Sequence, residues 1–191
     1  VLEHDSALAD NLVEDVLLEA AGTLTITDLD LSDTVSVTIN EDVVWEATNP
    51  AIAMPDNAIL WSMLSVTGEP LDANIGDDSN GNLAWSFAAQ DGVFDSLAQG
   101  ETLTLTYTIT ATDSAADQLT ATQTITITIT GTDDAPLIAL IDGVDSDQAD
   151  LVEEDVVLTA TGTVTVTDID LSDTVSMAVT ALKIDGTYGS E

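Results

Sequence analysis

The chain of 191 residues is 45% hydrophobic and carries 36 carboxylates against a single lysine, which gives a formal net charge of −35. The hydrophobic content is too high for a disordered acidic tail, and no apolar run reaches the roughly 18 residues of a membrane span. Nucleic acid and anionic membranes are excluded as partners, because both are bound through lysine and arginine. Such a surface attracts cations, although a solubility surface of the halophile type is an alternative interpretation.

The first predicted strand lies in the stretch GTLTITDLDLSDTVSV (22–37), where apolar Leu24 and Ile26 alternate with threonine. Alternation with β-branched residues is typical of a strand with one buried face. The stretch returns 140 positions later, and the segments 15–37 and 155–177 are identical at 16 of 23 positions. The sequence therefore predicts a tandem repeat of a β-rich unit.

The middle of the first repeat has a weaker pattern. AILWSMLSV (58–66) is a candidate strand, and GVFDSLAQG (92–100) is predicted to hold one helical turn. GDDSNGN (76–82) predicts a hairpin turn before the strand LAWSFAA (83–89). This turn has acidic residues but lacks the glycine position and the distal glutamate of an EF-hand.

Two long alternating runs follow, ETLTLTYTITATD (101–113) and ATQTITITITG (121–131), and the polar SAADQ (114–118) between them predicts a hairpin. Many short strands with almost no helix predict an all-β fold, a β-sandwich. Pro136 closes this unit.

The predicted organisation has four parts. They are an N-terminal linker (1–11), a β-sandwich repeat (12–136), an acidic linker (137–150) and a partial second repeat (151–191). The second repeat supplies about three strands, too few to close a sandwich, so we expect it to be marginal or to borrow strands from another chain. An acidic linker-like start and an end inside a repeat are expected of a piece of a longer protein.

Four segments, LVEDV, GTLTITDLDLSDT, FDSLAQGETLTLTYTITATDS and TQTITITITGTDDAP, resemble the VCBS repeat family, cadherin-like modules of large bacterial surface proteins and RTX-type adhesins. They cover most of residues 12–136 and the opening of the next unit from 151. The resemblance implies a Greek-key β-sandwich of the cadherin or immunoglobulin type. It also implies type I secretion, an extracellular place on the bacterial cell surface, and calcium-dependent cell adhesion. The segment 41–70 departs from the family by being longer and less typical.

Both copies of the repeated strand end in the same spacing of aspartates, D-x-D-x-x-D. Calcium takes six to eight oxygen ligands, and either an extended strand or a turn at the first aspartate could gather these carboxylates. Aspartate is also a common turn residue at strand ends, and that interpretation stays open for each residue alone. The aspartates are Asp28, Asp30 and Asp33 in the first copy and Asp168, Asp170 and Asp173 in the second.

In the cadherin arrangement that the chain resembles, calcium lies between consecutive repeats. Its ligands come from an N-terminal acid, the end of a late strand, the linker and the D-x-D of the next unit. The resemblance assigns the first copy's aspartates to a junction with a preceding unit. For the second junction it implies Glu14, Asp15, Asp113, Asp133, Asp134, Asp168 and Asp170, with Glu154 as the copy of Glu14. The linker aspartates Asp142, Asp145, Asp147 and Asp150 are predicted to be solvated.

Catalysis is not expected. The only histidine, His4, lies in the N-terminal tail, so no Ser-His-Asp or Cys-His arrangement can form within the repeat. A pair of carboxylates of the glycosidase type needs a cleft, and no feature of the sequence marks one.

The predicted function is a non-catalytic extender of a secreted, surface-anchored adhesin, made rigid by Ca²⁺ between neighbouring repeats of the same chain. It involves neither nucleic acid nor insertion into a membrane. The alternative is an adhesion module that binds a glycan or protein, on a host surface or in a biofilm, through the segment 41–70. That segment contains Trp45, a candidate surface ligand residue, whereas Trp61 and Trp85 are predicted to be core.

Overall fold

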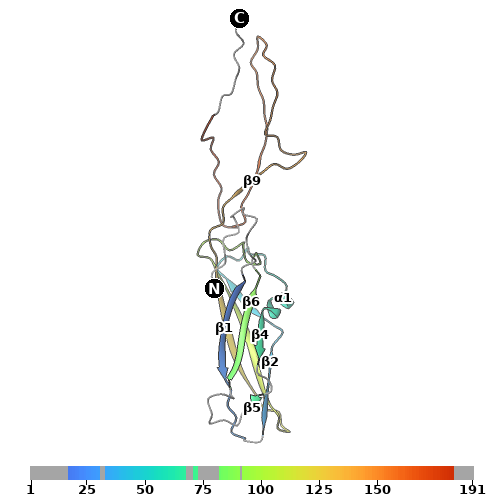
Figure 1. The fold of residues 1–191 in the computed structure, drawn as a ribbon, viewed down its shortest axis with the longest axis vertical. Helices are drawn as coiled ribbons and strands as arrows, with labels where there is room; N and C mark the ends of the chain where they lie inside the picture. The colour runs from blue at the N-terminus through green and yellow to red at the C-terminus, as the bar shows by residue number, and fades with distance from the viewer. Residues whose placement is uncertain (1–16, 31–32, 68–70, 73–81, 91, 183–191) are drawn as a thin grey trace. The chain divides into compact units, whose positions relative to one another are not determined.

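The computed structural model describes residues 17–30, 33–67, 71–72, 82–90 and 92–182. The chain divides into two compact units, residues 1–135 with 169–172 and residues 136–168 with 173–191. The first unit contains β1 to β8 and the short helix α1, and the second contains β9 and β10 (Figure 1).

The smaller sheet of the first unit has the strand order β1-β6-β4, and all of its pairs are antiparallel. Its strands are β1 (Leu18–Thr25), β6 (Asn82–Ala89) and β4 (Leu64–Thr67) (Figure 1). Gly22 of β1 lies opposite Trp85 of β6, and a Cβ atom at this glycine would come within 2.6 Å of the indole ring. A glycine inside the repeated strand therefore leaves room for the neighbouring tryptophan.

The larger sheet is centred on β7 (Thr102–Asp113), which pairs along its whole length with β8 (Thr120–Thr130). The other edge of β7 is shared by two strands. β2 (Thr34–Ile39) pairs with its carboxyl half and β3 (Val44–Ala47) with its amino half. The short β5 (Leu71–Asp72) pairs with β2. The predicted hairpin of two long strands is thus confirmed.

One continuous core joins the two sheets. Every second residue is buried from Leu103 to Ile109 in β7 and from Ile125 to Ile129 in β8, as the alternation of apolar residues and threonine requires. The same apolar cluster includes Leu83 and Phe87 of β6, so the inner faces of the two sheets pack against each other. The prediction of an all-β fold is confirmed. The buried residues of β7 and β8 are Leu103, Leu105, Tyr107, Ile109, Ile125, Ile127 and Ile129.

The prediction of a strand at 58–66 is wrong for the first half of that segment. Residues Asn57–Ser62 form the helix α1, and only the end of the segment enters β4. The apolar residues run from Ala58 to Trp61 without a break, and such a short run does not distinguish a helix from a strand. The helix turns Leu60, which is 1% exposed, into the core.

The segment 92–100 contains turns and no helix. A single bond from Leu97 N to Phe94 O, 3.0 Å long, takes the place of the predicted helical turn. The hairpin turn predicted at 76–82 lies almost entirely outside the described residues.

The second unit contains one small antiparallel sheet of β9 (Leu137–Ala139) and β10 (Thr165–Thr167). The segment 137–150, predicted as a linker, therefore contains a strand and the turn that follows it. Asp145 fixes this turn to β10, because its Oδ2 accepts hydrogen bonds from Ile141 N at 3.0 Å and Thr165 Oγ1 at 2.7 Å.

We expect Ile127→Ala to lower the free energy of unfolding of the first unit by about 2–5 kcal/mol, because it opens a cavity between the sheets. The neighbouring exposed Thr126→Ala is a matched control and should cost less than about 1 kcal/mol. Chemical denaturation followed by tryptophan fluorescence measures both. Equal losses from the two variants would contradict the assigned register of β8.

The hydrogen bonds from Ile141 and Thr165 hold the pKa of Asp145 below its usual value of 3.8. A carboxyl group with a lowered pKa stabilises the fold above the usual pKa, and this contribution is lost as the pH falls through the lowered value. We expect the Asp145 carboxyl to titrate below 3.8 by NMR, and Thr165→Val to move its pKa back up. Titration at or above the usual value in the unaltered chain would show that the turn does not form.

Candidate metal centre

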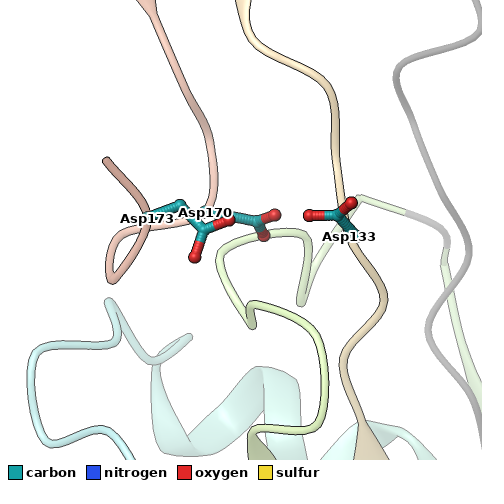
Figure 2. Close-up of side chains that lie close together, drawn as sticks. All are labelled: Asp133, Asp170 and Asp173. Atoms are coloured by element: carbon teal, nitrogen blue, oxygen red, sulfur yellow. The ribbon is translucent and has the colours of Figure 1, made fainter. Parts of the chain in front are cut away.

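Three aspartates bring their carboxylates together. Asp133 follows β8, Asp170 lies in the segment 169–172 that belongs to the first unit, and Asp173 comes directly after that segment. One carboxylate oxygen from each lies within 4.8 Å of the others. Figure 2 shows Asp170 and Asp173 on one loop, with Asp133 facing them from the neighbouring strand end.

The end of β8 is held in place by the loop that precedes β7. Gly131 N donates to Glu101 O at 2.9 Å, and Gly100 N donates to Gly131 O at 3.1 Å. A Cβ atom at Gly131 would lie 2.1 Å from Leu97 O, so the backbones of the two segments touch. This contact fixes the point from which the chain continues to Asp133.

Asp134 connects the same strand end to the segment 169–172. Its backbone N donates to Asp170 Oδ2 at 2.8 Å, and this hydrogen bond is buried. The side chains of Asp134 and Asp170 are only 3% and 2% exposed. The structure therefore places two buried carboxylates beside the exposed Asp133 and Asp173.

These buried carboxylates belong to a chain that is very poor in cationic side chains. The chain has one lysine and no arginine, and that lysine, Lys183, lies outside the described residues. Two carboxylates about 4 Å apart repel by roughly 1 kcal/mol in water and roughly 4 kcal/mol at an effective dielectric constant near 20. Buried charges in proteins are paired or coordinate metals, and a chain with one lysine and no arginine offers few side chains for such pairing.

The carboxylates of Asp134 and Asp170 are buried next to the exposed members of the cluster, and both residues take part in further interactions. Two oxygens bound to one calcium ion at about 2.3–2.6 Å cannot be more than about 5 Å apart, and the carboxylate cluster meets this limit. An all-oxygen, anionic set of ligands suits a hard divalent cation rather than a soft metal. The cluster could therefore hold a metal ion.

The structure does not group Asp113 with Asp133. β7 and β8 are antiparallel, so Asp113 lies at the hairpin end of the larger sheet, and Asp133 follows the opposite end. Asp113 instead lines a cavity of about 340 Å³ together with Asp28 and Asp30. In the arrangement that the resemblance implies, Asp28 and Asp30 belong to the junction with a preceding unit, whereas Asp113 belongs to the second junction.

Turn hydrogen bonds account for part of this second acidic group. Asp28 Oδ1 accepts from Asp30 N at 3.0 Å, and Asp113 Oδ1 accepts from Ala115 N at 3.1 Å. Asp33 N donates to Asp30 O at 3.0 Å. The turn interpretation of strand-end aspartates therefore applies here.

No other predicted ligand among the described residues belongs to this close group. Glu14 and Asp15 are outside the described residues, Glu154 is exposed, and Asp168 is half-buried but is not part of the close group. Asp95 was not predicted as a site residue, yet it is only 8% exposed in the loop before β7. Its one sequence signal is an acid inside the apolar run VFDSLA.

The tryptophans are distributed differently from the prediction. Trp85 packs partly buried against the core, as predicted. Trp61 is 39% exposed and its indole N–H donates to Ile39 O at 3.3 Å, so its assignment to the core was wrong. Trp45 is 43% exposed on β3.

Comparison of the chain with protein-family models, curated proteins and solved structures found no match. The similarity to VCBS repeats therefore rests on the four sequence segments alone. In the part of the chain that the structure describes, no helix is long and apolar enough to cross a membrane.

We expect Asp170→Asn to weaken calcium binding by about tenfold or more, because ligand charge largely sets calcium affinity. Asparagine keeps the shape of the side chain and an oxygen that accepts from Asp134 N, so the substitution mainly removes charge. Isothermal titration measures the affinity. Asp147→Asn, on the exposed turn of the second unit, is the control and should leave it unchanged. Equal affinities of the two variants would exclude Asp170 as a ligand.

Proposed function

We propose that this chain is a non-catalytic extender of a secreted protein on the bacterial cell surface, made rigid by calcium at the Asp133–Asp170–Asp173 cluster. The observation that carries the proposal is the composition of this cluster. Asp133 belongs to the first sequence repeat, whereas Asp170 and Asp173 belong to the second. An ion held by all three would tie the start of the second repeat to the end of the first.

Charge supports this role. A chain with a net charge of −35 repels itself, and repulsion is strongest where carboxylates gather. A divalent cation removes that repulsion locally and makes coordination bonds that need both repeats in place. Its absence would leave the same carboxylates pushing the two segments apart.

Calcium fits the setting that the sequence resemblance implies. Extracellular modules bind calcium with Kd values of about 10⁻⁴ to 10⁻³ M. Binding to the folded state alone adds about 2.7 kcal/mol of stability when the free ion is at about 100 times Kd. Such a module would be stiff outside the cell and loose where calcium is scarce.

The proposal predicts a response that is specific for calcium. Thermal unfolding in chelator, in calcium and in magnesium at matched ionic strength should show a large rise in midpoint with calcium alone, and Asp170→Asn should remove most of it. Equal responses to both ions would mean that simple screening of an acidic surface explains the effect.

The proposed stiffening of the chain by calcium can be measured separately from calcium binding. The chain has no cysteine, so Thr124→Cys with Val157→Cys gives two exposed spin-label sites, one in each unit. The label-to-label distance distribution should narrow with calcium and stay broad in the Asp170→Asn background. A distribution that calcium leaves unchanged would refute the extender role while leaving calcium binding itself intact.

A further inference from the structure

Two half-exposed tryptophans lie along one edge of the larger sheet. Trp45 is 43% exposed on β3, which pairs with β7 alone among the described strands. Trp61 is 39% exposed near the end of α1, and its indole N–H donates to Ile39 O of β2 at 3.3 Å. This carbonyl points away from β7, because the next residue, Asn40, bonds through its own N–H to Thr108 O, and successive residues of a strand point their backbone groups to opposite sides. Both indoles therefore border the side of β2 and β3 that faces away from β7.

The register of the sheet gives the spacing of the two indoles along this edge. Trp45 lies opposite Leu105 of β7, and Ile39, which accepts the hydrogen bond from Trp61, lies opposite Ile109. Leu105 and Ile109 are four positions apart, which corresponds to about 13 Å of strand. In an extended peptide the side chains at i and i+4 point to one face and have the same separation.

The chain between the two indoles is fixed to α1. Asn57 Oδ1 accepts a hydrogen bond from Val43 N at 2.9 Å, and Asn57 Nδ2 donates to Glu41 O. The helix is anchored in turn, because Leu60 is buried in the core. The ring of Trp61 is therefore held in place before a ligand arrives, and a preorganised site loses less conformational entropy on binding.

Acidic side chains lie between and beside the indoles. Glu41 and Asp42 are exposed in the chain that connects Ile39 to Trp45, and Glu46 is exposed on β3. The sequence has one lysine and no arginine, so it offers few cations of its own to pair with these acids. Aromatic faces next to carboxylates complement a planar cation, because a guanidinium group stacks on an indole and binds carboxylates through its fork of donors.

We propose that this surface, formed by Trp45, Trp61, Glu41 and Asp42 and called here the tryptophan edge, binds an extended segment of another protein that carries two arginines four residues apart. One guanidinium group stacks on each indole, and the carboxylates of Glu41 and Asp42 balance the charge between them. The net charge of −35 attracts a basic segment from a distance, and the indoles provide the preference for arginine. None of these residues belongs to the Asp133–Asp170–Asp173 cluster, so the inference does not depend on the calcium proposal.

Charge complementarity favours a basic polypeptide over a glycan at this edge. An uncharged sugar would use the two indoles but gain nothing from the net negative charge around them. A glycan that carries carboxylate or sulfate groups would be repelled. Arginine uses both features of the surface.

The probe is a fluorescein-labelled peptide of glycine and serine with two arginines four residues apart, added to the full chain in chelator at physiological ionic strength. We expect saturable binding at one site per chain by anisotropy. A peptide with lysine at both positions keeps the charge but loses planar stacking, and it should bind at least about fivefold more weakly. A citrulline peptide keeps the shape without the charge and should bind more weakly still. Equal binding of the arginine and lysine peptides would reduce the effect to simple charge attraction and overturn the proposal.

Trp45→Leu keeps an apolar side chain but removes the indole, and it should weaken binding of the arginine peptide at least about fivefold. Amide protection of Leu105 and Ile127 checks that the larger sheet stays intact in this variant. Full binding to Trp45→Leu, or no binding of the arginine peptide to the unaltered chain, would refute the proposal. A series of uncharged oligosaccharides is tested in parallel, and a sugar that binds in place of the arginine peptide would show that the edge is a carbohydrate site instead.

Two double variants separate the local carboxylates from the overall charge. Glu41→Gln with Asp42→Asn should weaken binding of the arginine peptide clearly more than Glu153→Gln with Glu154→Gln, which removes two adjacent exposed acids from the second unit. Equal losses from the two double variants would show that only the net charge matters and would contradict the assigned site. Because chelator is present throughout, the result is independent of the outcome of the calcium test.

Discussion

Tyr107 lies at the middle of β7 and joins three parts of the first unit. Its ring meets Phe87 of the opposite sheet edge to face at 6.4 Å, and its hydroxyl donates to Leu60 O of α1 at 2.9 Å. Burial raises the pKa of this phenol, so the group stays a neutral donor at any ordinary pH. Since β7 is also paired along both edges, the two sheets and the helix all depend on this one strand.

A second constraint acts after the end of β8, where the chain buries the carboxylates of Asp134 and Asp170. Most proteins neutralise a buried aspartate with arginine or lysine, and this chain has only Lys183 for the purpose. The hydrogen bond from Asp134 N to Asp170 Oδ2 satisfies one oxygen but supplies no net positive charge. The acidic composition and the three neighbouring aspartates thus point to the same place in the chain, a cluster that could hold a metal ion.

The sequence predicts the long strands well and the short elements poorly. Alternation over ten or more residues defines β7 and β8, because only a strand buries every second residue. The run Ala58–Trp61 is too short to show a period, and tertiary contacts of Leu60 decide that it becomes helical. Strand-end aspartates were found by their spacing, but which of them meet depends on strand direction. That is why Asp113 lies with Asp28 and not with Asp133.

Comparison of the two repeats distinguishes the effect of a strand's own sequence from the effect of the strands that pair with it. The stretch that ends in SDTVS forms a buried strand at 34–39 and an uncovered segment at 174–182. Alternation defines which side chains share a face, whereas burial of that face requires β7 or its equivalent. Pairing in a defined register, and not hydrophobicity alone, therefore builds the core of the first unit.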